Sequence, residues 1–516
     1  MARIIRNPQK PWSNFHTTFN QTVEELIVIS NDRSGLPLDN YNLTTQAILD
    51  LLDEGLSRQK QVRAGGSRWS LSPINFTNQW YLDTTRLSIA MHMEAGEVDP
   101  SYPGVPDDLA FAQCGVGIKQ LSTFFGRRQR SLKASGASNG QTIAGAIGTG
   151  VHGSSIEFGS VQDFVVGLHI LVSGSKNVYI ERSSYPVVSN SFVESIGATL
   201  IRNDDMFNAA LVSMGAFGFI HGVMVEAEPI YVLRNIVLDI SREQVNELIP
   251  TLDFANASFQ VPGMAGLRPW HFKLYINPYR SRGAIKAEVM YKEAYPAGYT
   301  SPHQGGVAQD YNKDLLGVIG ALSQQLKGSI AVMLRVLQNY GFPKNTPPRG
   351  EVRTLADMFY DTTTGGQTYS CAMGIPLQHC AAALQVIHDE MNINRDIPAI
   401  LALRFVKSSK ALMAFTRFSD ITCILEIDGV RVPAIDQFVH RIPALLDRQR
   451  IPYTFHWGKD NPMNTAMVQR IYGSDYNLWV RQRSRLMSFE EASLFSSNYS
   501  ASIGLAAWVA GETPVV

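Results

Sequence analysis

Cysteine is scarce in this chain, and its spacing excludes several kinds of site. The four cysteines among 516 residues are Cys114, Cys371, Cys380 and Cys423, and no two of them form a C-x-x-C pair. Four scattered thiols do not make a disulfide scaffold, and this spacing indicates neither a zinc knuckle nor a thioredoxin-like site. We therefore expect reduced, partly buried cysteines and no metal site.

Net charge and long apolar runs are absent as well. Lys plus Arg number 45, as do Asp plus Glu, so the formal net charge is zero. That balance provides no general attraction to nucleic acid or to a membrane surface. No run of roughly 18 apolar residues occurs, and the N-terminal MARIIRNPQKPW has no apolar signal core. We expect a cytoplasmic protein whose partners include neither nucleic acid nor a membrane.

The length and the hydrophobic pattern predict an α+β protein of more than one unit. TVEELIVI (22–29) predicts a strand, NLTTQAILDLLDEGLS (42–57) an amphipathic helix, and QVRAGG (61–66) the next strand. Glycine clusters then alternate with strand-like runs up to about residue 230. The predicted units are residues 1–230, residues 231–462, and a tail, 463–516, that returns to the first unit.

The second unit differs from the first in its predicted secondary structure, because longer helical stretches lie between its strands. Helical patterns occupy residues 314–337 and 377–392, whereas HFKLYINPY (271–279), ILALRFVK (400–407) and ITCILEI (421–427) are strand-like. The alternation predicts a second unit built from helices and strands.

Two glycine-rich clusters stand out in the first unit, and we place each after a strand-like run. Glycine lets a ligand approach the backbone, successive amides in such turns cradle an anion, and Ser and Thr add hydroxyl donors. Two such loops suit one long ligand with a pyrophosphate, although two tight turns between buried strands would have the same composition. Neither loop is a Walker loop or a full nicotinamide-dinucleotide fingerprint. The candidate ligand-binding residues are Arg63, Gly65, Gly66, Ser67, Arg68, Trp69 and Ser70 in the first cluster, and Gly136, Ser138, Thr142, Gly145, Thr149, His152, Gly153 and Ser154 in and just before the second.

Four segments in order resemble the FAD-binding domain of the vanillyl-alcohol oxidase superfamily. They are residues 61–70, 81–88, 140–175 and 211–229, and the last adds Gly218 and Ile220 along the adenine half of FAD. The resemblance implies an FAD-binding domain in two lobes, with an α/β cap domain built on an antiparallel sheet. It also makes the two glycine clusters the FAD loops, the second of them at the pyrophosphate.

The C-terminal half is similar to the alditol and aldonolactone oxidases of that superfamily. ILALRFVKSS resembles their Glu-x-Arg strand, and PYTFHWGKD resembles their His-Trp-Gly-Lys segment. By resemblance, Arg404 and Lys459 are the catalytic candidates, while His456 is either a base or a packing residue. His271 and Tyr275 share one face of a strand and are the candidate substrate-binding residues, although core packing would place them equally well.

Two positions depart from the family pattern. Trp69 stands where many members carry the histidine that tethers the flavin, so we expect non-covalent FAD. Ala402 stands where the Glu of Glu-x-Arg is expected, which weakens the case for a polyol or lactone substrate.

The expected function is FAD-dependent oxidation of an alcohol or hemiacetal carbon of a small substrate to a carbonyl, with hydride transfer to flavin N5. Oxygen or another acceptor then takes the electrons. Oxidation of a hydrophobic secondary metabolite and a flavin-binding module without turnover remain the alternatives.

Overall fold

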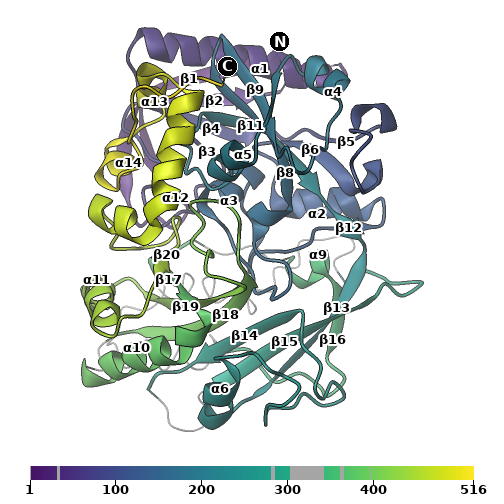
Figure 1. Ribbon diagram of the computed structural model, residues 1–516, viewed down its shortest axis with the longest axis vertical. Coiled ribbons are helices and arrows are strands. Elements are labelled where there is room, and N and C mark those ends of the chain that lie inside the picture. Colours follow the sequence, from purple (N-terminus) through teal and green to yellow (C-terminus); the bar gives the residue numbers. More distant parts are fainter. Residues whose placement is uncertain are drawn as a thin grey trace.

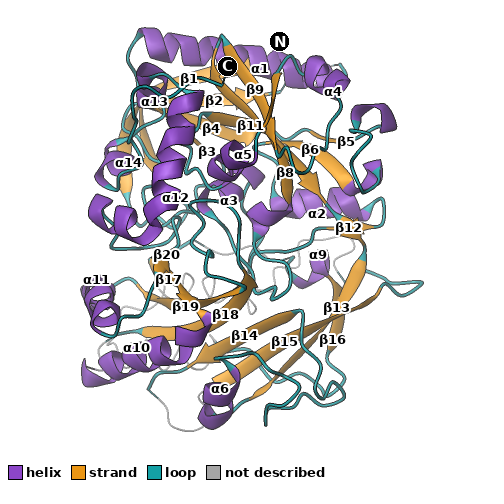
Figure 2. Ribbon diagram, viewed as in Figure 1, coloured by secondary structure: helices purple, strands orange, loops and turns teal. Residues whose placement is uncertain are grey.

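The computed structural model describes residues 2–31, 35–279, 285–302, 342–360, 365–394 and 397–515. These residues form an upper part, with two main sheets, and a lower part built on one large sheet (Figures 1 and 2). The helix expected over 314–337 lies outside the described residues. The mixed α+β class expected from the sequence is confirmed.

The first sheet of the upper part has the strand order β1-β2-β4-β3. Its strands are β1 (Arg3–Ser13), β2 (Asn20–Ser30), β3 (Val62–Gly65) and β4 (Trp80–Arg86), and helix α1 (Pro37–Ser57) connects β2 to β3. Strands β2 and β3 run parallel to β4, as the strand–helix–strand pattern predicts.

Strand β1 was not expected, because Pro8 and Pro11 interrupt its pattern. It pairs antiparallel with β2 at the edge of the sheet, from Arg3 opposite Ser30 to Ser13 opposite Asn20. Proline is tolerated in an edge strand, where its missing amide need not be paired on the outer side.

The second sheet of the upper part has the order β10-β9-β8-β11-β6-β5, and a two-stranded ladder joins β12 to β7. Every residue of β8 is buried, so this strand forms the centre of the core. The strands are β5 (Ala90–His92), β6 (Leu109–Gln113), β7 (Arg130–Ser131), β8 (Val165–Ser173), β9 (Lys176–Glu181), β10 (Thr199–Arg202), β11 (Phe219–Glu226) and β12 (Glu228–Pro229). The helices are α2 (Ile118–Gly126), α3 (Ile143–Thr149), α4 (Asn190–Ser195) and α5 (Asp204–Leu211).

The lower part is an eight-stranded sheet of order β16-β13-β15-β14-β18-β19-β17-β20. All its neighbouring pairs are antiparallel, which agrees with the expected cap. The strands are β13 (Tyr231–Asp239), β14 (His271–Ile276), β15 (Ile285–Ala294), β16 (Glu351–Thr354), β17 (Thr368–Pro376), β18 (Ala399–Lys407), β19 (Ile421–Val430) and β20 (Thr454–Phe455). The helices are α6 (Arg242–Leu248), α9 (Leu355–Met358), α10 (Cys380–Asn394) and α11 (Pro433–Arg448).

The C-terminal helices lie beside the upper part, and both chain ends are at the top of Figure 1. They are α12 (Thr465–Leu486), α13 (Phe489–Leu494) and α14 (Asn498–Ser502). Buried Arg483 of α12 donates a 2.8 Å hydrogen bond to the carbonyl oxygen of Ala216 in the upper part. The boundaries near 230 and 462 stay a prediction.

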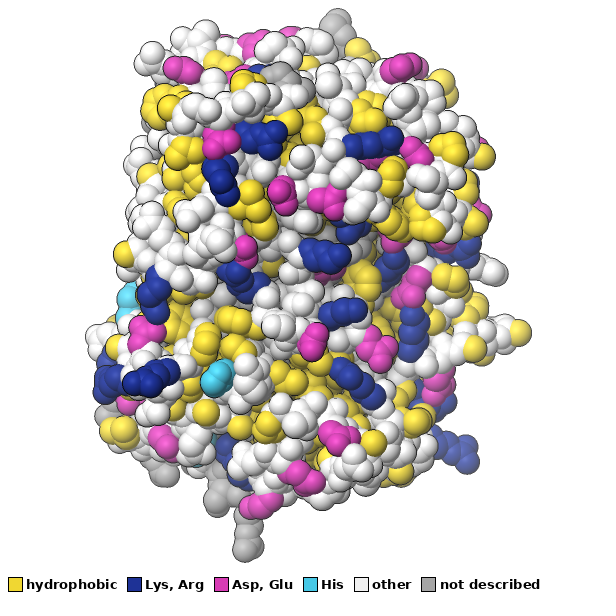
Figure 3. Space-filling view, viewed as in Figure 1, with side chains coloured by type: hydrophobic (Ala, Val, Ile, Leu, Met, Phe, Trp, Pro, Cys, Tyr) yellow, Lys and Arg dark blue, Asp and Glu magenta, His cyan; other side chains and the backbone are white. Residues whose placement is uncertain are grey.

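Charges of both signs are interspersed on the face shown in Figure 3, as expected for a chain with equal numbers of acidic and basic residues. Among the described residues, no helix has the length and apolar character needed to cross a bilayer. The four cysteines are free and buried.

Candidate active site

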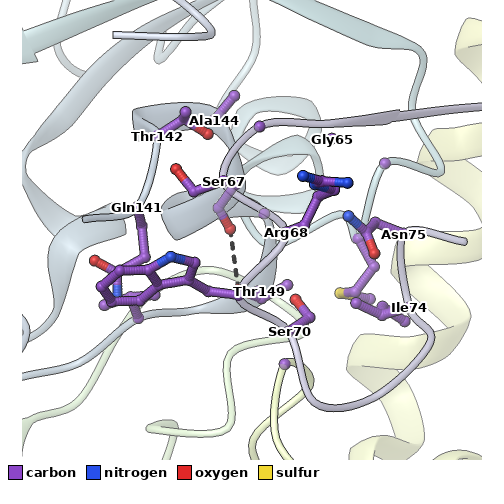
Figure 4. Close-up of a pocket in the computed structure, with 18 of the residues that line it drawn as sticks. Gly65, Ser67, Arg68, Ser70, Ile74, Asn75, Gln141, Thr142, Ala144 and Thr149 are labelled. Atoms are coloured by element: carbon purple, nitrogen blue, oxygen red, sulfur yellow. Dashed lines mark hydrogen bonds between the residues drawn. The ribbon is translucent and has the colours of Figure 1, made fainter. Parts of the chain in front are cut away.

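The main cavity has a volume of about 230 Å³ and receives lining residues from both parts of the molecule. The upper part contributes the loop after β3, the segment around α3 and the start of β11, and the lower part contributes β18, β19 and the segment after β20. Figure 4 shows Gln141 and Thr142 on one side of this space and Ile74 and Asn75 on the other. The candidate residues that line it are Arg63, Gly65, Gly66, Ser67, Arg68, Trp69, Ser70, Ser138, Thr142, Gly145, Thr149, His152, Gly218, Ile220, Arg404, His456 and Lys459.

The first glycine cluster follows strand β3, as predicted, and packs tightly against its surroundings. A Cβ at Gly65 would overlap the hydroxyl of Tyr81, and a Cβ at Gly66 would overlap the side chain of Thr142. Ser67 Oγ donates a 2.6 Å hydrogen bond to the carbonyl oxygen of Gly140. These two glycines are therefore required for close packing of the loop, independently of any ligand.

The second glycine cluster does not follow a strand-like run, contrary to the prediction. Thr142 precedes the short helix α3, and Gly150 ends it with φ 75°, in the left-handed region that favours glycine. A Cβ at Gly148 would meet no atom within 4 Å, and one at Gly145 would meet only Thr142 Oγ1, at 3.2 Å. Both glycines line the cavity, so here the missing side chains leave space for a ligand.

Arg63 joins the first loop to the neighbouring segments. Its guanidinium donates hydrogen bonds to the carbonyl oxygens of Ile74 (2.6 Å), Phe495 (2.8 Å) and Met214. No carboxylate among the described residues pairs with it, and burial lowers the pKa of Arg63 to about 10. Arg63 therefore has a structural role at the cavity wall.

Arg68 and Trp69 occupy the tip of the first loop. Arg68 is exposed and adopts φ 57°, a left-handed conformation that is unfavourable for a side chain with a Cβ. The ring of Trp69 stacks on Phe15, with 5.2 Å between ring centroids.

Three candidates from the second cluster lie outside the main cavity. A Cβ at Gly153 would overlap the carbonyl oxygen of Ser135, so packing against this backbone requires glycine at position 153. Ser154 Oγ donates to the carbonyl oxygen of Phe272 and accepts a 3.1 Å hydrogen bond from the amide of Phe405, so it joins the two parts of the molecule. Gly136 packs beside the side chain of Val151.

A buried carboxylate that the sequence analysis did not single out, Glu426 of β19, organises the other end of the cavity. It is 1% exposed, and its oxygens lie 2.7 Å from Arg404 Nε and 2.5 Å from Lys459 Nζ. Burial acts to raise the pKa of Glu426, but the charges of Arg404 and Lys459 hold it well below the usual range. Glu426 is directly opposite Ala402 in the β18–β19 register, so a carboxylate is present although residue 402 lacks one.

Two histidines lie beside this cluster and have different hydrogen-bonding capacity. His152 Nε2 lies 3.7 Å from Glu426, while its Nδ1 donates to the carbonyl oxygen of Gly153 at 3.2 Å. His456 Nδ1 instead accepts a 2.9 Å hydrogen bond from the amide of Gly458. Burial lowers the pKa of His152 well below its usual value and that of His456 to about 3. Both rings are therefore neutral, and only His152 has a free acceptor nitrogen on the side of the charged cluster.

A smaller cavity of about 50 Å³ lies next to the first, and Arg404 lines both. His271 and Tyr275 of β14 line this second cavity and not the main one, and Gly153 of the second glycine cluster lines it as well. Tyr275 Oη donates a 2.9 Å hydrogen bond to Glu288 of β15.

Sequence reasoning missed Glu426, Asp428, Lys273 and Glu288, each of which lines one of the cavities. A signal was present, because Glu426 interrupts the apolar run ITCILEI and Lys273 interrupts HFKLYI. A charge inside an otherwise apolar strand needs a buried partner or a functional reason.

The chain matches no protein-family model. It is 21% identical to L-gulono-1,4-lactone dehydrogenase from Mycobacterium tuberculosis over 448 residues, which cover 86% of this chain and 91% of that protein. It is 30% identical to a putative D-arabinono-1,4-lactone oxidase from Neurospora crassa over 177 residues, which cover 34% of this chain and 26% of that protein.

Solved structures share the fold over almost the whole chain. Cholesterol oxidase from Brevibacterium sterolicum superposes with a TM-score of 0.67 at 14% identity and covers 97% of both chains. A chitooligosaccharide oxidase gives a TM-score of 0.54 at 11% identity, over 95% of this chain and 92% of that one. At such low identity the likeness concerns the fold alone.

Proposed function

We propose that this chain is a member of the vanillyl-alcohol oxidase superfamily of flavoenzymes and that it uses FAD to oxidise an alcohol or hemiacetal carbon of a small organic substrate. The observation that carries the proposal is the Arg404–Glu426–Lys459 cluster, which faces the same cavity as the two glycine loops.

The residues that line the large cavity fit a flavin dinucleotide. Gly145 and Gly148 leave open space at the cavity wall, with Thr142 Oγ1 3.2 Å from the ideal Cβ of Gly145, and Ser138 lines the same cavity. Backbone amides and hydroxyls of this kind bind phosphate without a dedicated cation. We assign the pyrophosphate to this loop and the ring system to the space beside Arg404 and Lys459.

The charged cluster suits the oxidation of an alcohol. When bound, FAD supplies the acceptor for the hydride that leaves the substrate carbon. Arg404 and Lys459 both contact Glu426 and both line the cavity, so either cation can hold the substrate oxygen. His152 Nε2 is the atom that would take the hydroxyl proton, because His456 presents a donor nitrogen there.

Three finer statements belong to this proposal. FAD is held without a covalent bond, because Trp69 stands at the expected place of the tether. Oxygen or another acceptor reoxidises the flavin, and the protein is cytoplasmic.

The reaction is tested by adding alcohols, sugars, lactones and sterols to the FAD-loaded protein without oxygen. A true substrate bleaches the yellow flavin absorbance, and the carbonyl product accumulates in stoichiometric amount. If the flavin stays oxidised with every compound class, the alternative of a flavin-binding module without turnover replaces the proposal.

The place of FAD is tested by Gly148→Val. The new side chain would project into the cavity, so we expect colourless protein with a wild-type circular dichroism spectrum. Gly126→Val is the matched control, because Gly126 also lies in the last turn of a short helix, has no atom within 4 Å of its ideal Cβ, and lies outside the cavity. Full FAD content in both variants would move the cofactor away from this loop.

A further inference from the structure

The second cavity is lined by polar groups that the hydride transfer itself does not use. It lies between the cap sheet and the upper part, which contributes Ala137 and Gly153 to its wall. Strands β13, β14 and β15 supply Asn235, Lys273 and Glu288. Because Arg404 also lines the main cavity, a substrate held at the charged cluster can extend into this space.

Lys273 is the unusual member of this group. It is 5% exposed, and its Nζ lies 4.1 Å from the centroid of the Tyr275 ring. Within the described ranges, it forms no ion pair with a carboxylate. A buried ammonium group without a carboxylate in contact is costly. Burial together with nearby Arg404 lowers the pKa of Lys273 to about 8, although the charges of Glu426, Glu288 and Asp428 act in the opposite direction.

The nearby carboxylates are already engaged. Glu288 accepts the hydroxyl hydrogen bond of Tyr275, at 2.9 Å, and has the amide of Asn235 at 3.5 Å. Glu426 is shared between Arg404 and Lys459. Asp428, the third carboxylate whose charge acts on Lys273, accepts a 2.6 Å hydrogen bond from Ser370 Oγ. None of the three carboxylates forms an ion pair with Lys273 Nζ in the described part of the chain, so its hydrogen-bond donors are left for a ligand.

Two more buried atoms lack partners among the residues that the structure describes. They are His271 Nε2, which lies 3.9 Å from Glu288 without a hydrogen bond to it, and Asn235 Oδ1; both residues line the cavity. Unpaired buried polar atoms at a cavity wall are the groups that a polar ligand satisfies. A sterol or another apolar molecule would leave them unpaired.

We propose that this cavity binds the carboxylate of the substrate, so that the enzyme oxidises a hydroxy acid of the sugar-acid type. Lys273 and Arg404 hold the carboxylate, and Asn235 accepts a hydrogen bond from a neighbouring hydroxyl. A cavity of about 50 Å³ is large enough for this end of a molecule, since a water-sized group needs roughly 10–15 Å³. The inference rests on the proposed oxidation for the identity of the bound molecule as a substrate.

The test compares acids with alditols of the same carbon chain: threonate against threitol, xylonate against xylitol, and gluconate against glucitol. Binding to the FAD-loaded protein is measured by calorimetry, and turnover by bleaching without oxygen. We expect at least one acid to bind at least about tenfold more tightly than its alditol, because a charge-assisted contact is gained.

The variants are Lys273→Met, which keeps the length but removes the charge, and Lys273→Arg, which keeps the charge. We expect the preference for the acid to disappear in the first and to survive in part in the second. Lys292→Met is the matched control, because Lys292 belongs to the same sheet but is exposed and outside the cavity.

The outcomes separate this inference from the proposed function. Acid binding that depends on Lys273 without bleaching would support the subsite and refute the oxidation. Bleaching by the acids at wild-type rates in Lys273→Met would support the oxidation and refute the subsite. Absence of acid binding in all three pairs would also overturn the subsite. So would a loss of affinity in Lys273→Met that is equal for the acid and its alditol.

Discussion

Replacing Glu426 by Gln tests the electrostatic reasoning about the site most directly. The substitution keeps the size of the side chain and removes the one carboxylate that lies between Arg404 and Lys459. Buried Arg404 and partly buried Lys459 then lose the carboxylate that they share. Among the described residues, the more distant carboxylates of Asp428 and Glu288 remain to offset part of their charge. We expect a large loss of stability and a slower flavin reduction from the same change.

The magnitude follows from the burial of the group. Removing one partner of a buried ion pair costs about 3–5 kcal/mol, because the remaining charge is left desolvated. If the 231–462 unit melts cooperatively, each kcal/mol lowers Tm by about 2–4 °C. The expected decrease in Tm is therefore roughly 6–20 °C. It is measured by circular dichroism with and without FAD.

The pH dependence of unfolding independently checks that ionised Glu426 stabilises the folded protein. The pKa of Glu426 is lowered in the folded protein, so its stabilising contribution is present above the unfolded pKa of about 4.3. This contribution is lost as the pH falls through the lowered folded pKa. The difference in stability between the wild type and Glu426→Gln should therefore be full at neutral pH and should narrow progressively below about pH 4.3.

A double variant serves as the control for the position of the carboxylate. Ala402 is directly opposite Glu426, and facing residues on antiparallel strands have Cβ atoms about 5 Å apart. Ala402→Glu combined with Glu426→Ala should restore at least half of the lost stability. A wild-type Tm and a wild-type reduction rate in Glu426→Gln would refute the reasoning.

Two further predictions concern the flavin. Arg404→Ala should slow flavin reduction at saturating substrate by about a hundredfold while FAD stays bound, since a preorganised charge is lost; an unchanged stopped-flow rate would remove Arg404 from the catalytic group. Acid precipitation should release a yellow supernatant and the intact mass should equal that of the bare polypeptide, because Trp69 cannot form the tether. A mass increased by one FAD would direct attention to His16, Cys114 or His152, which line the cavity.

The sequence was informative where local pattern determines local structure. The parallel β2–α1–β3 arrangement follows from the alternation of a strand, an amphipathic helix and a strand. The antiparallel cap was expected through the family resemblance. In contrast, the prolines of β1 concealed an edge strand, because only the finished sheet shows which amides need no partner. The glycines of 145–150 likewise concealed helix α3, because glycine is a poor helix former.

The candidate site was harder to predict, because its chemistry depends on the register between strands. Arg404, Lys459 and His456 belong to recognisable segments and were predicted to share a site, and they line one cavity. Nothing local connects residue 402 with residue 426, which lie on different strands. Their contact exists only because β18 and β19 pair with Ala402 opposite Glu426.

This register changes how the replacement of the Glu of Glu-x-Arg by Ala402 is interpreted. The chemistry of such a site requires a carboxylate at a point in space, and two facing strands offer more than one chain position close enough to supply it. Ala402 is 1% exposed and small, and Glu426, from the facing strand, reaches the arginine at 2.7 Å. The absence of Glu at 402 is therefore no argument against a hydroxyl-rich substrate. The polar lining of the second cavity instead weakens the case for a hydrophobic substrate, since an apolar group bound there would leave the ammonium of Lys273 desolvated and without a hydrogen-bond acceptor.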